Sequence, residues 1–449
     1  MKKLLLLALA AIGIVACHKG NNPEDNLADY TVIVYAHVGG DMDDDMEIIW
    51  EEIKDKLAAL PEGTGKKVRV LALYKYGIPS EGFSGKYGEP GEVFCFELDK
   101  DTDFTKLHTE GAAAKTQSLK LYDPENIKAV LNRAKKELPA KEYILVFHGH
   151  GGGFQPAYDY LKEEYTKGLL VDDWLDAAPL TQFEIRMGIE RSSIPHLKAI
   201  MFHDCLMGGM ETLVEVAPLA DYLIATPFML TSENTPLIPV MVKCLGECSD
   251  FETAARKTFS DSEARLYDGY VKEGVPYNGN IELVKGAALE NVCSVTRELV
   301  TRLCELYPSR KEAIDKATCS VYKFYNDRPF FDLMDYASKL AGETGDEKLA
   351  DIRDRMKTAF DGAVLKQMTF DLKVLPLLPS FSLSVVLVPH EAYSWPETYE
   401  YSVFHKKTGW GKWLDENTCT PKGNPFGQGE EIKPLIRMIP KRYFSRRAY

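Results

Sequence analysis

The sequence predicts an α/β protein with a mostly parallel sheet covered by helices on both faces. Short apolar runs rich in β-branched residues alternate with longer stretches in which apolar residues recur at helical spacing. Strands buried on both faces are continuously apolar, and residues 31–36, 68–74, 143–147 and 197–202 have this character. Alternation of such strands with amphipathic helices is typical of crossover units in a parallel sheet.

The remaining elements follow in chain order. Strands are also expected at 92–98 and 222–225, and helices at 43–60, 124–138, 180–189 and 207–217. The first helix has apolar residues on one face, and the second has Pro124 at its start, where proline is favoured. After about residue 250 the pattern is more helical, with helices expected at 251–259, 283–306 and 331–341. The apolar run 381–388 is expected to be a late strand of the main sheet.

Composition bounds the possible classes of protein. The chain has 449 residues, of which 45% are hydrophobic and 27% charged, and a formal net charge of −13. These values exclude collagen-like, low-complexity and disordered chains. The length favours two or three domains. Because phosphate binding needs a basic face, a pI near 5.3 without a Lys/Arg block predicts no nucleic-acid partner.

The first residues have the pattern of an export signal. Two lysines precede an apolar run from Leu4 to Ala16, which is shorter than the about 20 residues that span a bilayer. The run ends in two aliphatic residues, a small residue and Cys17, which resembles a bacterial lipobox. We therefore predict a lipoprotein signal peptide at 1–16, lipidation of Cys17 and a flexible tether at 17–29. The alternative is an ordinary signal peptide with a chance cysteine. The predicted location is a membrane, with the protein at the periplasmic face or the cell surface.

A glycine-rich turn with two histidines follows the strand at 143–147. Its sequence is His148-Gly149-His150-Gly151-Gly152-Gly153. Glycines let a substrate approach the backbone and leave N–H groups facing it. Histidine is the usual proton donor and acceptor at neutral pH. This segment is therefore the first candidate for catalytic chemistry.

A cysteine follows the strand at 197–202 in the same way. Cys205 is expected at the start of the helix at 207–217, where the helix N-terminus lowers the pKa of a thiol. The carboxyl ends of parallel strands meet at one edge of a sheet, so Cys205 is expected beside the histidine turn. A thiol beside an imidazole is the arrangement of a cysteine hydrolase, whereas either residue alone is more often structural. The chain lacks the Gly-x-Ser-x-Gly motif that an esterase would need.

At these residues the sequence resembles the clostripain family of cysteine peptidases, whose caspase-like fold is shared by gingipains, legumain and caspases. The matching segments are Tyr143–Phe147 with His150-Gly151, Leu197–Phe202 with Cys205-Leu206-Met207, Glu211, Val214–Ala217, Ala220–Ala225, Val32–Tyr35 with Gly40-Asp41, Leu383–Val388 and Trp410–Trp413. The resemblance covers most of residues 30–415. It implies a caspase-like α/β/α sandwich at 30–247 and a smaller helical and α/β region at 248–449 that contributes a late strand to the sheet.

The resemblance also implies catalytic roles. Cys205 would attack the scissile carbonyl and His150 would protonate the leaving amine. The N–H groups of Gly151 and Cys205 would form the oxyanion hole. His148 is the alternative acid/base, but His150 has the small residue before it and the glycine after it that the family shows. The expected partner is a peptide or protein substrate, and the expected state is a monomer.

The substrate pocket departs from the family pattern. Where the family reads Asp-Ala-Cys, and the Asp helps to select Arg or Lys, this chain reads His203-Asp204-Cys205. Thr226 follows the next strand, where the family has Ser-Glu or a similar pair. With His203, Asp204 and Thr226 as the expected pocket residues, cleavage after Arg or Lys stays in doubt. The alternative function is a catalytically inactive surface lipoprotein that uses the same fold for binding.

We expect no cofactor and no metal. The acidic run Asp41, Asp43, Asp44 and Asp45 is similar to part of a calcium loop but lacks the required glycine, so calcium stays an open alternative. Cys244 and Cys248 are spaced like half a zinc site, but no second pair matches them. Eight cysteines besides Cys17 permit disulfides in an exported chain, and their pairing is not readable from the sequence.

Overall fold

The computed structural model describes residues 27–36, 42–61, 65–77, 83–115, 121–154, 170–171, 179–228, 230, 237–266, 279–324, 329–370, 383–387 and 399–419. The predicted signal peptide, Cys17 and nearly all of the tether lie outside these residues. No helix in the described part of the chain has the length and apolar character needed to cross a bilayer.

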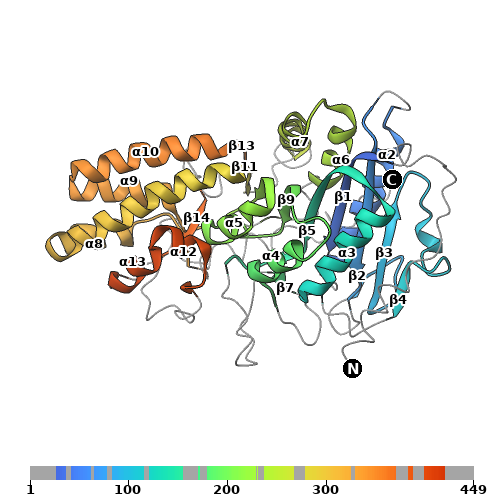
Figure 1. Cartoon of the computed structure of the whole chain (residues 1–449), viewed down its shortest axis with the longest axis horizontal. Coiled ribbons are helices and arrows are strands. Elements are labelled where there is room, and N and C mark those ends of the chain that lie inside the picture. Colours follow the sequence, from blue (N-terminus) through green and yellow to red (C-terminus); the bar gives the residue numbers. More distant parts are fainter. Residues whose placement is uncertain are drawn as a thin grey trace.

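A large central sheet organises the described residues (Figure 1). Its nine strands, in spatial order, are β13 (Val364–Phe370), β11 (Gly279–Lys285), β10 (Ala220–Ala225), β9 (Leu197–His203), β5 (Ala140–His148), β1 (Ala28–Ala36), β2 (Val68–Lys75), β3 (Glu92–Leu98) and β4 (Ala113–Lys115). The five strands from β10 to β2 are parallel, and antiparallel pairs extend both edges. The predicted α/β architecture with a mostly parallel sheet is confirmed.

Helices cover both faces of this sheet (Figure 1). Along β1, Val32 and Val34 belong to one buried core, whereas Ile33 and Tyr35 belong to the other, because successive side chains of a strand point to opposite faces. The helices of the first face are α2 (Asp43–Ala58), α6 (Leu237–Glu247) and α7 (Phe251–Leu266). Those of the second face are α3 (Pro124–Glu137), α4 (Gln182–Glu190) and α5 (Met210–Val216).

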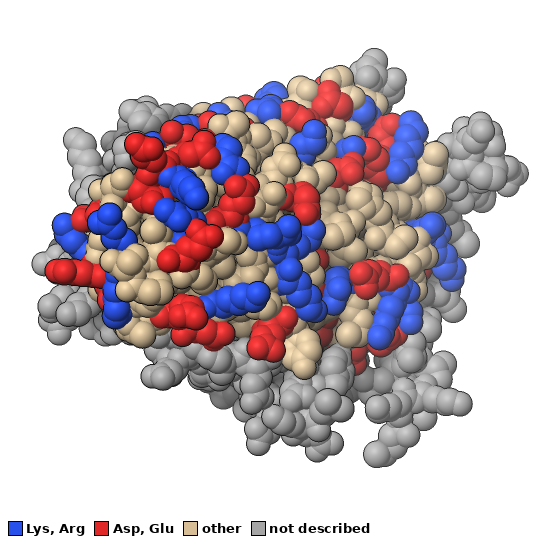
Figure 2. Space-filling view, turned by 60° about the vertical axis from the view of Figure 1, so that its left-hand side comes forward, with Lys and Arg blue, Asp and Glu red and all other residues tan. Residues whose placement is uncertain are grey.

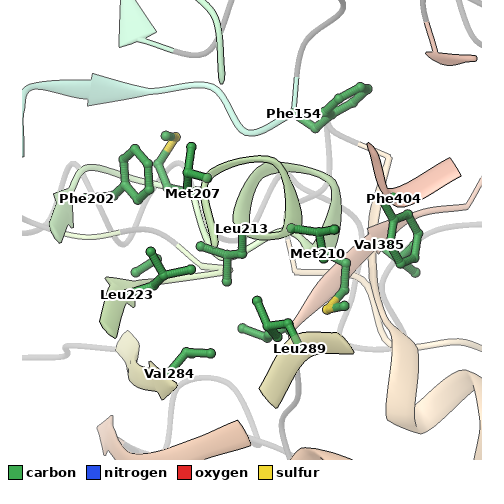
Figure 3. Packing of buried hydrophobic residues seen from close by; sticks show 14 of the residues in the cluster. Phe154, Phe202, Met207, Met210, Leu213, Leu223, Val284, Leu289, Val385 and Phe404 are labelled. Atoms are coloured by element: carbon green, nitrogen blue, oxygen red, sulfur yellow. The ribbon is translucent and has the colours of Figure 1, made fainter. Parts of the chain in front are cut away.

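The C-terminal region continues the second core rather than forming a separate one. Its helices are α8 (Leu289–Cys319), α9 (Leu333–Thr344), α10 (Glu347–Ala363), α12 (Val403–Thr408) and α13 (Trp410–Glu416). Figure 3 shows Met210 and Leu213 of α5 between Leu223 of the sheet and Val385 and Phe404 of this region, all in one cluster. The short helix α5 is therefore enclosed on both sides.

Two expected elements differ in the structure. The range 283–306, expected as one helix, contains the end of β11 and the start of α8, so the sheet gains a strand there. The run 381–388 contains β14 (Ser384–Val386), which pairs with β12 (Phe330–Asp332) and not with the main sheet. The late strand that does join the sheet is β13. Apolar character marks these segments as buried but does not identify the strand with which each one pairs.

A disulfide and many ion pairs hold the C-terminal region. Cys319 at the end of α8 is bonded to Cys419, a hundred residues later in the chain. On the face shown in Figure 2, Lys and Arg are interspersed with Asp and Glu. Pairs such as Arg355 with Glu298 are at hydrogen-bond distance but exposed, so each contributes at most about 1 kcal/mol.

Candidate active site

Cys205 lies in the turn between β9 and α5. The turn is attached to the segment 226–230, because the Leu206 N–H donates to the Phe228 carbonyl at 2.8 Å and the Gly208 N–H donates to the Thr226 carbonyl at 2.7 Å. Leu206 has a φ of 63°, a left-handed conformation that costs a non-glycine residue about 1–2 kcal/mol. The two hydrogen bonds to the 226–230 segment thus hold the turn in a shape in which Leu206, directly after the cysteine, is strained.

The thiol of Cys205 is enclosed by the same segment. Its sulfur donates to the Leu230 carbonyl at 3.3 Å and accepts from the Leu230 N–H at 3.2 Å. Burial raises the pKa of this thiol to about 11, and the carboxyl of Asp204 raises it further, whereas the Leu230 N–H lowers it. The expectation that a helix N-terminus would lower this pKa is therefore wrong for this conformation. The helix begins at Met210, five residues after Cys205, and not at 207 as predicted.

His150 comes from a small separate sheet. It lies in β6 (His150–Gly151), which pairs with β7 (Leu170–Val171), and β7 pairs with β8 (Pro179–Leu180). The side chain of His150 is partly exposed, in contrast to its buried neighbours in β5. The histidine turn is thus positioned by backbone pairing with a segment that lies between it and Cys205 in the sequence.

Gly151 connects the two halves of the candidate site. A Cβ atom on Gly151 would lie 2.0 Å from the carbonyl oxygen and 2.8 Å from the amide nitrogen of Cys205, which no real side chain can do. The backbone of Gly151 therefore lies directly against that of Cys205. The two residues predicted to supply an oxyanion hole are brought together. His150 is the residue directly before Gly151 in the chain.

His148 and His203 form a buried pair. They are opposite each other in the register of β5 and β9, and each is 1% exposed. Their Nδ1 atoms are 2.9 Å apart, so one imidazole donates a hydrogen bond to the other. His148 is thus engaged with His203 and buried, whereas His150 is partly exposed.

The three expected pocket residues point in different directions. His203 faces His148, whereas the Cβ of Asp204 lies 2.9 Å from the position that a Gly151 Cβ would take, on the side of the histidine turn. The hydroxyl of Thr226 accepts a hydrogen bond from the Phe228 N–H at 3.0 Å. All three are buried. In this conformation they do not line one open pocket.

A sequence model of the clostripain family matches residues 91–364, well over half of the chain. The chain belongs to the clostripain family of cysteine peptidases. A comparison with curated protein sequences gave no match.

Solved structures of clostripain-family, or C11, proteases have the same fold. A secreted C11 cysteine protease from Bacteroides thetaiotaomicron, in complex with an irreversible peptide inhibitor, has a TM-score of 0.62 at 15% identity, over 85% of this chain and 99% of that one. An inactive zymogen C11 protease from Parabacteroides distasonis has a TM-score of 0.57 at 16% identity, over 85% and 98% of the two chains. At these identities the likeness shows the fold alone.

In this clostripain-family chain, two buried carboxylates fix α5. Glu211 accepts from the Val386 N–H at 2.9 Å and from the Tyr399 hydroxyl at 2.7 Å, and burial raises its pKa to about 7. Glu215 accepts from the Val403 N–H at 3.1 Å and pairs with Arg186. In the sequence, Glu211 stands out only as part of the family pattern. A carboxylate within an apolar helix was the available signal that it binds another segment.

In the acidic run that left calcium as an alternative, Asp43 has protein partners. Asp43, at the start of α2, accepts hydrogen bonds from the Tyr74 hydroxyl and the Gly77 N–H, which fixes the end of β2. Asp41 lies outside the described residues. Across the residues that the structure describes, no group of three or more His, Cys, Asp or Glu side chains is arranged to hold a metal ion.

A cavity of about 500 Å³ lies at the end of the strands opposite to the end that carries Cys205 and His150. It is lined by residues at the starts of β10 and α8, including Asp221 and Glu290, and by His196 just before β9. Cys205 and His150 follow the carboxyl ends of their strands, so this cavity belongs to a different part of the molecule.

Proposed function

We propose that this cysteine peptidase hydrolyses peptide bonds with Cys205 as nucleophile and His150 as acid/base. The observation that carries the proposal is the contact of Gly151 with the backbone of Cys205. It supports an oxyanion hole formed by the N–H groups of these two residues, where each donor is worth about 3 kcal/mol in the transition state.

The proton path follows from these positions. The Cys205 thiol gives its proton to His150, the sulfur attacks the scissile carbonyl, and the imidazolium returns the proton to the leaving amine. The Leu230 backbone lies beside the sulfur, and the thiol has a pKa of about 11 there. We infer that Leu230 moves when a substrate binds, because a peptide carbonyl must approach the same sulfur.

We further propose export and attachment to a membrane by a lipid on Cys17. The apolar run that ends at this cysteine supports attachment, and a secreted relative with the same fold supports export. The Cys319–Cys419 disulfide adds independent support, since disulfides persist mainly outside the cytoplasm. Metabolic labelling with a fatty-acid analogue tests the lipid: the wild-type chain should be labelled and a Cys17→Ala chain should not.

The residue preferred before the scissile bond is a separate question. Where the family resemblance implies an acid, this chain has His203, whose imidazole is hydrogen-bonded to that of His148. A basic side chain of a substrate would meet imidazoles there, so we propose no preference for Arg or Lys. The raised pKa of the Cys205 thiol favours a second candidate function, an inactive lipoprotein that uses the fold for binding.

Labelling with peptidyl acyloxymethyl ketones separates the two functions. A panel with basic, acidic and apolar residues in the leading position is used against wild type, Cys205→Ala and Cys95→Ala, the last being a buried cysteine in β3. Labelling that is lost only in Cys205→Ala supports the peptidase, and the reactive member reports its specificity. If no member labels Cys205, the peptidase proposal fails and the binding function stands.

Two histidine variants test the choice of acid/base. His150→Ala should lower kcat at least a hundredfold, which is typical for loss of a general acid or base. His148→Ala should retain more activity, because it removes a partner of His203 and not the proton carrier. The reverse order would assign the role to His148.

A further inference from the structure

Asp204 is a buried carboxylic acid directly beside the candidate nucleophile. It is 1% exposed and follows the last residue of β9. Among the residues that the structure describes, neither of its carboxyl oxygens accepts a hydrogen bond of ordinary geometry. Its side chain points to the histidine turn, because its Cβ lies 2.9 Å from where a Cβ of Gly151 would be. The turn therefore packs on Asp204 as well as on Cys205, whose carbonyl oxygen lies closer, at 2.0 Å from the same position.

A buried carboxyl in such a place needs a partner. An ionised carboxylate without one costs several kcal/mol in a protein interior. Burial accordingly raises the pKa of Asp204 well above its ordinary value, and the two groups that oppose this are the imidazole of His150 and the N–H of Gly149. Both belong to the histidine turn, so the one charged group that favours the ionised form of Asp204 is the candidate acid/base itself.

We propose that Asp204 is a positioning residue that faces the histidine turn from the nucleophile's own turn and stabilises His150 once that imidazole has accepted a proton. This inference rests on the proposed function, in which His150 carries the proton. It assigns Asp204 to the catalytic pair rather than to the substrate pocket. The orienting acid then comes from the residue before the cysteine, a place that in the family pattern belongs to a small alanine.

Under this proposal, each stage of the reaction has one group that carries the thiol proton. The thiol proton passes to the neutral imidazole of His150 and then to the leaving amine, and Asp204 is a carboxylate while His150 carries that proton. Its charge stabilises the imidazolium, which is the form that protonates the amine. The same charge disfavours the thiolate of Cys205, so Asp204 strengthens the acid and weakens the nucleophile.

Other titratable groups of the described residues lie on or beside these turns. Cys205 is on the same turn as Asp204, and His148 and His203 lie at the ends of β5 and β9 with their imidazoles hydrogen-bonded to each other. These two histidines follow the alternation that sends Val146 and Met201 to the core of the first face. Asp204, one residue further along, points to the other side. The effect of Asp204 is therefore expected on His150 and Cys205.

The test is a titration of the histidine side chains by NMR in the full folded chain, which does not need activity. The resonance of His150 is assigned with a His150→Gln chain. In Asp204→Asn, His150 should lose its proton about one pH unit lower than in wild type, as expected for removal of an adjacent opposite charge. Glu282→Gln is the matched control, because Glu282 is another fully buried carboxyl but is bonded to Asn280 and Gln367 on β11 and β13.

Activity then supplies the second measurement. The basic limb of the kcat/KM profile should move down by the same amount in Asp204→Asn, and kcat should fall about tenfold or more while KM is kept. An unchanged titration of His150 overturns the inference even if the enzyme is active. If His150 shifts but Cys205 is not labelled by any peptidyl ketone, the proposed function fails and the Asp204–His150 pair stands.

Folding failure does not remove the test. If Asp204→Asn is unfolded, Asp204→Ala is titrated in its place. In wild type, a carbon-13 label on the aspartate carboxyls reports whether one buried carboxyl titrates together with His150. If the carboxyl signal shows no change at the pH where His150 titrates, the two groups titrate independently and the inference is overturned.

Discussion

The turn that carries Cys205 and the turn that carries His150 follow neighbouring parallel strands, yet they are held in opposite ways. The cysteine turn is attached to the 226–230 segment and precedes a helix enclosed by the C-terminal region. The histidine turn is partly exposed and paired with two-residue strands only. Cys205 and His150 are both partly exposed, so the two halves of the candidate pair differ in how their turns are attached and not in burial.

This difference means that contacts with distant parts of the chain act mainly on the cysteine turn. Glu211 and Glu215 connect α5 to residues of the C-terminal region, so distant parts of the chain position the nucleophile. The histidine side depends on its immediate neighbours. Variants of the two sides should therefore separate effects on chemistry from effects on stability.

The largest effect is expected where the two turns touch. Gly151→Ala places a Cβ 2.0 Å from the Cys205 carbonyl, so the histidine turn must move away. We expect kcat to fall at least a hundredfold, since one oxyanion donor and the acid/base are displaced together. Gly342→Ala in α9, with nothing within 4 Å of its Cβ, is the control and should be neutral or slightly stabilising. Equal activities of the two variants would contradict the contact.

The second effect concerns the distant support of the cysteine side. Cys319→Ser removes a disulfide that closes a loop of a hundred residues and should lower the free energy of unfolding by about 2–4 kcal/mol. Cys304→Ser, a free cysteine on the same helix, is the matched control. Urea denaturation measures both, and equal midpoints for the two variants would argue against the bond.

The third effect is a change in the pH dependence of stability. The folded pKa of Glu211 is about 7, above its ordinary 4.5, so its contribution to stability falls as pH rises through this window. The hydrogen bonds from the Val386 N–H and the Tyr399 hydroxyl both reach Oε1, which glutamine retains. Glu211→Gln should therefore be more stable than wild type at pH 8, by on the order of 1–3 kcal/mol, and this gain should disappear near pH 4.5.

The control for this variant is Glu298→Gln. Glu298 is exposed and paired with Arg355, which lowers its pKa, so the variant should not gain stability at pH 8. Thermal unfolding of the three chains at pH 5 and pH 8 supplies the comparison. A parallel pH dependence of wild type and Glu211→Gln would show that Glu211 does not titrate as described.

The smallest effect is expected in the segment that covers the sulfur. Thr226→Val removes the hydroxyl that accepts from the Phe228 N–H, which should cost about 1 kcal/mol and loosen the 226–230 segment. Alkylation of Cys205 by iodoacetamide should become a few times faster. Thr212→Val in α5 is the control, because the Thr212 hydroxyl is buried with no hydrogen-bond partner among the described residues. Slower alkylation in Thr226→Val would contradict the proposed covering role.

Strand positions near the site were predictable, and their surroundings were not. Continuous apolar runs before His150 and Cys205 indicate strands buried on both faces, and parallel strands end at one edge. That reasoning needs only local sequence, and it predicted that the two residues follow strands of one sheet, which are the neighbours β5 and β9. The start of α5 was predicted too early, because Gly208 and Gly209 continue the turn before Met210.

The sequence does not show which distant segments contact each other. The pairing of 384–386 with 330–332 and the Cys319–Cys419 bond both depend on where α8 to α10 place the chain. The contact of Leu230 with the Cys205 sulfur uses backbone atoms, which carry no residue-specific signal. Asp204 was visible as a departure from the family pattern, but the direction of its side chain required the turn geometry.

The order of strands in the main sheet also bears on how the chain folds as it is made. β1, the earliest strand in the sequence, lies inside the sheet, and β13, the last strand to join it, lies at an edge. The sheet can grow outward from β1 as successive strands emerge, first β2 on one side and later β5 on the other. Its β10 side stays open until residues 279–285 arrive, and those wait for 364–370. Such sequence-distant pairings slow folding, so a half-made chain exposes an unpaired strand for longer than a chain of local hairpins would.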